Sequence, residues 1–212
     1  KIAAMKTKTH DVSVIVANAK TRITKKIGYI KRDLEECKEA DKYKLWGDLI
    51  TSSLYMITGK SKTCEVVNYY SEEMETVKIP LDIKLSASQN AAKYFKKYTK
   101  LKKAKEILTE QLREATEQIA YLETVETAII LSENERDVSQ IKAELTDAGF
   151  ISKAKVADGK KAPKKVQIVP LKFTTSGGHT VLCGKNNVQN DFITTKLASK
   201  HDWWFHVKNE PG

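Results

Sequence analysis

Apolar residues recur at a regular spacing along two long stretches of this sequence. In one of them, 86–132, the apolar residues fall in alternating steps of four and three residues from position 94 onward. Nine of the eleven positions in this series are apolar or aromatic, and the series is Tyr94, Tyr98, Leu101, Lys105, Leu108, Leu112, Ala115, Ile119, Leu122, Glu126 and Ile129. Such a heptad pattern, sustained over about five repeats, is typical of a coiled coil. Because one helix cannot bury the stripe alone, the sequence predicts a partner helix within the chain or a dimer.

A second stretch, 11–58, supplies a candidate partner. It predicts a first long helix whose seam follows the same steps at Ile23, Ile27, Ile30, Leu34 and Cys37. Beyond this seam the apolar positions drift to Leu45, Leu49 and Leu54, so we expect a broader apolar contact there. Gly28 and Gly47 interrupt the helix, each at a cost of about 1 kcal/mol relative to Ala. We therefore expect this helix to depend on packing against the second one.

Between the two helices lie two short runs rich in β-forming residues, 64–70 and 75–79. Polar turn residues separate the runs and Pro80 follows the second, so the sequence predicts a small β-hairpin. Ser86 and Gln89 have the spacing of a capping box, which marks the start of the second helix. Two long helices joined by a tip at about 60–85 are expected to fold back into a monomeric antiparallel arm, about 60–70 Å long.

The remainder of the chain predicts a third helix and a separate α+β part. Residues 135–148 carry Val138, Ile141 and Leu145 on one face and are followed by Gly149, which predicts a short helix. The run 151–165 is rich in lysine and poor in apolar residues, which predicts a linker. The elements expected after it are strands at 166–173, 179–183 and 203–208 and a short helix at 191–199.

Together these elements predict a mainly α protein with a small α+β part. The predicted domains are a coiled-coil arm at 1–150, a basic linker at 151–165 and the beginning of another domain at 166–212. The chain begins without Met and ends directly after a strand-like run, so we expect it to be a fragment of a longer protein.

Charge narrows the classes of partner. The 212 residues hold 37 Lys and Arg against 27 Asp and Glu, a formal charge of +10 that favours an anionic partner such as RNA, DNA or a membrane surface. Three cysteines far apart in the sequence indicate neither a disulfide framework nor a zinc cluster, and they favour a reducing cytosol. No apolar run reaches membrane-spanning length, and a membrane is not among the partners that we predict.

A run of lysines near the tip is the main candidate for an anion contact. Positions 93–105 hold seven lysines and no acidic residue, a density that suits the phosphate backbone of a nucleic acid. The candidate nucleic-acid-binding residues in this region are Lys93, Lys96, Lys97, Lys100, Lys102, Lys103 and Tyr70. Tyr70 is included because an exposed aromatic ring can stack on a base. The alternative is that the lysines form a solvated coiled-coil face and the tyrosine packs onto the helices.

The sequence contains no arrangement typical of catalysis. Ser176-Gly177-Gly178 is a turn and not a phosphate loop, because no Gly-Lys-Ser or Gly-Lys-Thr follows it. If 203–208 is a strand, His201 and His206 point to opposite faces and are not expected to share a metal ion. We predict no enzymatic activity, no metal and no cofactor for this chain.

Several runs of the sequence resemble the NFACT family. Asn-Tyr-Tyr at 68–70, Asn-Ala-Ala-Lys-Tyr-Phe-Lys-Lys-Tyr at 90–98 and Tyr-Leu-Glu at 121–123 resemble the family's middle coiled coil. The runs 184–191 and 202–212 resemble the start of its carboxy-terminal NFACT-R domain. These two runs extend the candidate nucleic-acid-binding set to Lys185, Asn187, His206 and Lys208. The family often has Arg at the position of Lys185, so a two-pronged contact to phosphate is not expected there.

The resemblance implies a ribosome-associated quality-control factor of the cytoplasm. It would bind a large ribosomal subunit obstructed by peptidyl-tRNA and, in bacteria, recruit alanyl-tRNA to extend the stalled chain with alanine. The implied partners are therefore the rRNA of the large subunit and tRNA. Two alternatives stay open: a cell-surface adhesin for fibronectin, a label that the family also carries, and a purely structural coiled coil that dimerises.

Overall fold

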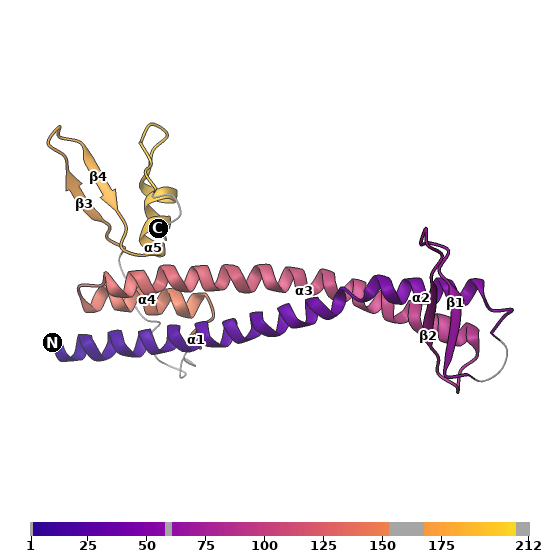
Figure 1. Ribbon diagram of the computed structural model, residues 1–212. Helices are drawn as coiled ribbons and strands as arrows, with labels where there is room; N and C mark the ends of the chain where they lie inside the picture. Colours follow the sequence, from indigo (N-terminus) through magenta and orange to yellow (C-terminus); the bar gives the residue numbers. More distant parts are fainter. Residues whose placement is uncertain (1, 58–60, 153–167, 207–212) are drawn as a thin grey trace, which may run out of the picture. The chain divides into compact units, whose positions relative to one another are not determined.

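The protein is mainly helical and carries two small antiparallel sheets, as predicted. The structure, a computed structural model, describes residues 2–57, 61–152 and 168–206, with side chains from residue 7 onward. Its elements (Figure 1) are α1 (Ile2–Cys37), α2 (Ala40–Ser52), β1 (Thr63–Val67), β2 (Thr76–Pro80), α3 (Ala87–Ile130), α4 (Glu135–Asp147), β3 (Leu171–Thr174), β4 (Thr180–Cys183), α5 (Asn187–Phe192) and a π-helical segment, Ile193–Leu197.

The chain divides into two compact units, which we describe separately. The hairpin unit comprises residues 27–114 and contains the end of α1, α2, the β1–β2 hairpin and the first part of α3. The α4 unit comprises the start of α1, up to residue 26, and the described residues from 115 onward. The helices α1 and α3 thus contribute to both units.

In the hairpin unit, helices and sheet share a small apolar core. Leu49 and Ile50 of α2, Val66 and Ile79 of the sheet, and Ala91 of α3 are buried together. β1 and β2 pair antiparallel over their five residues each, with Thr63 opposite Pro80. The predicted hairpin is therefore confirmed, and its buried positions are those that alternate toward the helices.

The first predicted helix is interrupted, which the sequence analysis did not foresee. α1 ends at Cys37 and α2 begins at Ala40, because the N–H groups of Lys38 and Glu39 donate to carbonyls only three residues back. Neither of the glycines noted in the sequence lies at this turn. The turn ends the α1 seam and lets α2 present the consecutive residues Leu49 and Ile50 to the sheet.

The start of α3 is fixed by two polar devices. Ser86 and Gln89 form the predicted capping box, in which each backbone N–H donates to the other's side chain, at 2.9 and 3.2 Å. The buried Asn90 accepts from the N–H of Asp82 at 2.8 Å and donates to three loop carbonyls. These bonds hold the loop that immediately precedes α3, the helix that carries the lysine run.

The heptad seam of α3 is confirmed. Ten of its eleven predicted positions are buried or half-buried, and the exposed one is Lys105. The other polar position, Glu126, accepts a 2.7 Å hydrogen bond and ion pair from Lys20 of α1 within the α4 unit. Here α1 and α3 lie side by side in opposite directions (Figure 1), so a helix of the same chain covers the stripe.

The third predicted helix is confirmed as α4, which packs against α1 and α3 in the α4 unit. Asn134 caps its first turn by accepting from the N–H groups of Arg136 and Asp137. The buried apolar residues of this three-helix arrangement are Val12, Val16, Ala19, Ile23, Ala115, Leu122, Val125, Ala128, Ile129, Val138, Ile141 and Leu145.

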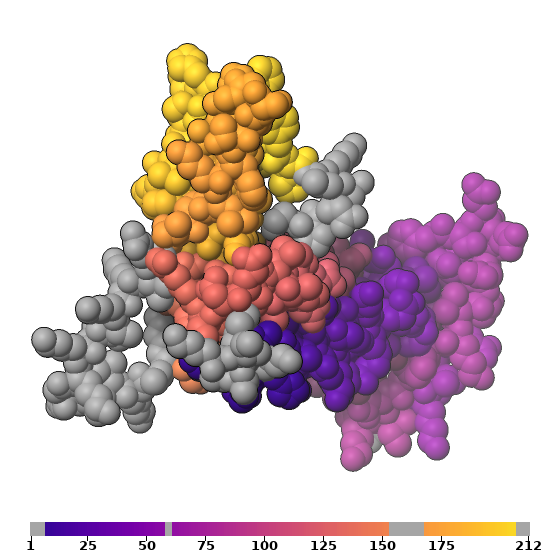
Figure 2. Space-filling model, turned by 90° about the vertical axis from the view of Figure 1, so that its left-hand side faces the viewer, coloured from indigo at the N-terminus to yellow at the C-terminus, as the bar shows by residue number. Residues whose placement is uncertain are grey.

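The carboxy-terminal part departs from the predicted elements. Within the described residues, the first predicted strand is confined to Leu171–Thr174, and it pairs antiparallel with Thr180–Cys183. Residues 203–206 form no strand, and all of them are exposed. The predicted helix at 191–199 begins earlier, at residue 187, because Asn186 caps it, and it ends in the π-helical segment. Figure 2 shows residues 168–206 (orange to yellow) seated on the helices of the same unit.

The predicted linker lies almost wholly at 153–165, outside the described residues, as does the start of the first predicted strand, 166–167. The domain boundaries proposed from the sequence stay a prediction.

Candidate functional site

Five lysines of the predicted run lie on one side of α3 in the hairpin unit. At about 100° per residue, they fall within an arc of about 120°. The opposite side of the helix packs inward through Ala91, Tyr94 and Phe95. All five lysines are exposed, and we call them the basic face: Lys93, Lys96, Lys97, Lys100 and Lys103.

Lys102 is not part of the basic face. It lies roughly 160° around the helix from the middle of that arc, although it was predicted together with the other five. Its ammonium is 5.8 Å from the centre of the Tyr98 ring, which belongs to the seam. The structure therefore brings five of the six predicted lysines of α3 together.

The five lysines differ in how far they are engaged within the protein. Lys93 pairs with Asp82 at 3.1 Å, while Lys97 donates to the Tyr43 hydroxyl at 2.7 Å and lies 3.9 Å from that ring's centre. Among the described residues, the ammonium groups of Lys96, Lys100 and Lys103 have no partner. Three positive charges on one side of the helix are thus open to an anion.

Asp82 and Tyr43 are neighbours of the basic face that the sequence analysis missed. The N–H of Lys84 and the ammonium of Lys93 both favour the ionised form of Asp82, so its pKa lies below the ordinary value. Tyr43 comes from α2, far from the lysine run in sequence, and no local pattern links the two. Both side chains fix lysines in place and leave the other three free.

Tyr70 lies in the same unit but in a different chemical setting. It belongs to the loop between β1 and β2, and the centre of its ring is 4.5 Å from the centre of the Tyr69 ring. A hydrogen bond with Tyr69 raises the pKa of the Tyr70 hydroxyl. The loop also carries Glu72, Glu73 and Glu75, whose charges repel the phosphates of a nucleic acid and so oppose the base stacking predicted for Tyr70.

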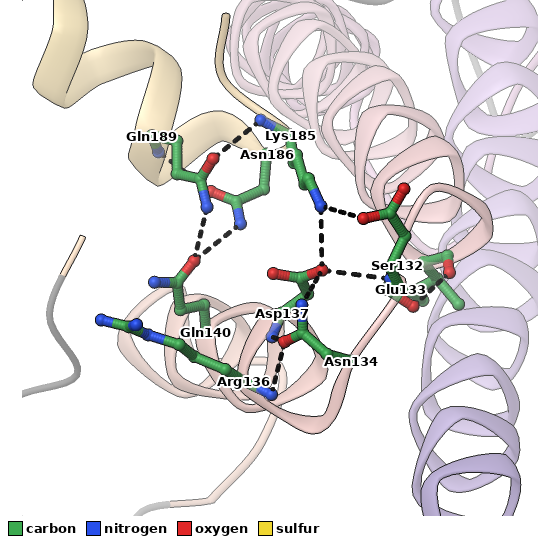
Figure 3. Close-up of polar contacts among 10 residues, drawn as sticks. Ser132, Glu133, Asn134, Arg136, Asp137, Gln140, Lys185, Asn186 and Gln189 are labelled. Carbon is green, nitrogen blue, oxygen red and sulfur yellow. Dashed lines mark hydrogen bonds and ion pairs between the residues drawn. The ribbon is translucent and has the colours of Figure 1, made fainter. Parts of the chain in front are cut away.

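Lys185 is held inside the α4 unit. Its ammonium lies 2.7 Å from Oε2 of Glu133 and 3.5 Å from Oδ2 of Asp137 (Figure 3), and the side chain is only 13% exposed. The hydrogen bond with Glu133 is the main cause of a raised Lys185 pKa, with Asp137 adding to it. The charge that the sequence analysis assigned to a nucleic acid is therefore neutralised by two carboxylates of the same chain.

The residues that follow Lys185 dock on α4 through buried amides. Oε1 of Gln140 accepts from Nδ2 of Asn186 at 3.2 Å and from Nε2 of Gln189 at 2.8 Å (Figure 3). All three side chains are buried. We call the contacts of Glu133, Asp137 and Gln140 with Lys185, Asn186 and Gln189 the polar dock.

Asn187 extends the same attachment to α3. Its Nδ2 donates to Oγ1 of Thr124 at 2.8 Å and to Oε1 of Glu144 at 2.9 Å. Like Lys185, it was proposed as a nucleic-acid contact, but both protons of its amide are donated within the protein. The run that starts at Gly184 therefore serves to join the carboxy-terminal part to the helices.

The last predicted site residues are His206 and Lys208. His206 is exposed and stacks on Trp204, with ring centres 5.3 Å apart, while Lys208 lies outside the described residues. In the part of the chain that the structure describes, no three His, Cys, Asp or Glu side chains gather to hold a metal ion. Among the same residues, no helix combines the length and the apolar character needed to cross a membrane.

Comparison with known proteins places these features in a family. Residues 1–165 match the family described as NFACT N-terminal and middle domains. The Rqc2 homolog RqcH of Bacillus subtilis is 36% identical over 208 residues, which are 98% of this chain and 36% of that protein. The protein of the same name from Streptococcus suis is 34% identical over 199 residues, 93% of this chain and 34% of that protein. The chain thus spans about a third of the length of these relatives.

A solved structure agrees with this comparison. The carboxy-terminal part of the fibronectin/fibrinogen-binding protein from Streptococcus suis superposes with a TM-score of 0.63 at 26% identity. The match covers 98% of this chain and 68% of the solved one. By the extent of the family match and by its relatives, the chain is a member of the NFACT family.

Proposed function

We propose that this chain is part of a ribosome-associated quality-control factor, and that its basic face binds rRNA of the large ribosomal subunit. The observation that carries the proposal is the gathering of five exposed lysines on one side of α3, with no acidic residue between positions 93 and 105. The relatives named Rqc2 homolog RqcH support the same process.

The chemistry of the basic face favours contacts with phosphates over reading of bases. Lysine is a compact point charge on a flexible stem and lacks the planar fork with which arginine grips a base edge or a phosphate. Phosphate contacts position a protein on nucleic acid but carry no sequence information. We therefore propose that the basic face orients the helices on rRNA, and that recognition of the stalled subunit depends on other contacts.

The rest of the proposal concerns the whole protein, because this chain spans only about a third of the length of its relatives. We propose that the complete factor works in the cytoplasm, engages tRNA and supports alanine tailing of stalled chains. Within it, this chain acts by binding and not by catalysis. Because Lys185 and Asn187 are engaged in the polar dock and at Thr124, we do not include them among the rRNA contacts.

Replacing Lys96, Lys100 and Lys103 with Glu in the full-length protein is expected to abolish co-sedimentation with purified large subunits. These three ammonium groups have no partner among the described residues, so the substitutions break no internal contact there. For the wild-type protein, binding should fall steeply with salt. A milder variant with three Ala residues should lower the slope of log K against log salt by about three, because each phosphate contact contributes roughly one.

A matched control makes the same change of charge at three lysines outside the basic face. Lys31, Lys44 and Lys62 are exposed residues of the same unit that lie outside α3, and their replacement with Glu should leave most of the binding intact. Equal loss in both triple variants would mean that only net charge matters. Unchanged binding of the first variant would refute the assignment of the basic face.

Fibronectin binding is the second candidate function. It is favoured by one observation, the match to a solved fibronectin/fibrinogen-binding protein. Saturable binding of fibronectin that persists at physiological salt would support it. If the binding disappears when salt is raised modestly, it is nonspecific attraction to a protein of formal charge +10, because salt screens such attraction.

A further inference from the structure

The hydrogen bonds that hold the carboxy-terminal part on the helices of the α4 unit run in one direction. Within the described residues, six side-chain bonds join residues 185–189 to α3, α4 and the segment between them, and all six are donated from 185–189. The donors, which we call the donor run, are Lys185, Asn186, Asn187 and Gln189. The acceptors are Thr124, Glu133, Asp137, Gln140 and Glu144.

Backbone groups determine which way the amides of the donor run point. The N–H of Gln189 donates to Oδ1 of Asn186, and the N–H of Lys185 donates to Oε1 of Gln189, both at 2.9 Å. The two NH₂ groups are therefore left to face Gln140 (Figure 3). Asn187 is oriented by Glu144, because an ionised carboxylate can only accept. The single direction of the bonds is thus fixed by the fold.

The attachment buries polar side chains. Among the described residues 168–206, the buried ones are Asn186 and Gln189, and none is apolar. Separating an apolar contact returns its whole surface to water, whereas hydrogen-bonding groups find new partners in water or in a ligand. The carboxy-terminal part can therefore leave α4 at a modest cost if another acceptor takes up its donors.

The donor run has the chemistry of an anion contact. An ammonium and several N–H donors suit phosphate, whose oxygens accept, and Lys, Asn and Gln side chains are common phosphate contacts in complexes with nucleic acids. In the structure, the carboxylates of Glu133, Asp137 and Glu144 take the positions that such an anion would occupy. The helices thus engage the donor run as a phosphate backbone would.

We propose that the polar dock is an autoinhibitory contact, in which acceptors of the helices occupy donors that bind RNA phosphates once the carboxy-terminal part has left α4. The donor run binds either the helices or RNA, but not both. In the docked state, the RNA contacts are those of the basic face. The choice of RNA as the competing anion rests on the proposed function.

The test measures the Kd of a short polyuridine RNA for the full-length protein, with and without Gln140→Leu. This change removes the acceptor shared by Asn186 and Gln189 and leaves the net charge unaltered. We expect it to lower the Kd at least about threefold, because the donor run is then free in a larger fraction of the molecules. Thr124→Val, which removes one acceptor of Asn187, should lower the Kd by a smaller factor.

A second substitution identifies the group that binds. Adding Lys185→Met to Gln140→Leu should cancel the gain in affinity, since Lys185 carries the charge of the donor run. Lys200→Met is the matched control, because Lys200 is exposed in the same part of the chain and outside the polar dock. This change removes the same charge but should keep the gain. Hydrogen exchange of residues 185–192 in the same samples reports whether the segment has left α4.

The outcomes separate this inference from the proposed function. If the wild-type and Gln140→Leu proteins bind RNA with equal Kd, or if Lys185→Met and Lys200→Met cancel the gain equally, the inference is overturned and the role of the basic face stands. If neither the wild type nor any variant binds RNA, the proposed function is overturned as well.

Discussion

Replacing Gln140 with Leu is expected to release the carboxy-terminal part of the α4 unit from α4. One oxygen, Oε1 of Gln140, accepts from both Asn186 and Gln189, at 3.2 and 2.8 Å. Leu has nearly the same volume but no acceptor, so two buried amide groups would lose their partner. A buried donor without an acceptor costs about 1–3 kcal/mol of stability. The loss of two partners is therefore expected to cost more than an ordinary hydrogen bond contributes to stability.

Hydrogen exchange of the backbone amides of residues 185–192 measures this release directly. We expect these amides to exchange much faster in the Gln140→Leu variant, while the amides of α1 keep their protection. Lys142→Leu is the matched control, because Lys142 is exposed on the same helix and its change should stay within about 0.5 kcal/mol. Equal protection of 185–192 in the Gln140 variant and the wild type would show that the polar dock does not hold this segment.

The helices could be predicted from the sequence because the spacing of their apolar residues indicates which side of each helix is buried. The steps of four and three that start at Tyr94 place Leu122 and Ile129 on the covered side of α3, where both are buried. The start of α3 could likewise be predicted from Ser86 and Gln89, because a capping box involves only residues that are close in the sequence. Patterns of this kind are local, so they can be recognised without knowledge of the fold.

The polar dock could not be predicted, because its contacts join residues far apart in the sequence. Lys185 pairs with Glu133 across 52 positions, and Gln189 donates to Gln140 across 49. A lysine or an asparagine in a loop can equally bind an external phosphate or an internal carboxylate, and the sequence does not distinguish the two. The break after Cys37 could not be predicted either, because neither Gly nor Pro stands at it.

The basic face lies between these cases. Helical geometry alone separates Lys102 from Lys96 and Lys100, so the spacing of the run already contained that distinction. The tethering of Lys97 by Tyr43 of α2 did not follow from any spacing. The number of lysines was therefore visible in the sequence, but the number that remain open to an anion was not.

Replacing Gly47 with Ala is expected to destabilise the hairpin unit. A Cβ at this position would lie 2.8 Å from Cε1 and Cζ of Phe95, closer than side-chain carbons approach in folded proteins. Phe95 packs against the core that contains Leu49 and Ile50, so moving it disturbs that core. Overpacking of this kind costs about 1–3 kcal/mol, more than the gain of about 1 kcal/mol that Ala brings over Gly in a helix.

Gly28 supplies a control of opposite sign, because it is exposed in α1 and a Cβ there would meet nothing within 4 Å. Urea denaturation should show Gly28→Ala to be more stable than the wild type by up to about 1 kcal/mol and Gly47→Ala to be less stable. Phe95→Leu relieves the close approach, so adding Gly47→Ala to that variant should cost less than adding it to the wild type. If both glycine variants gained the same stability, Phe95 would not be the reason for glycine at position 47, and only the helix propensity of alanine would remain.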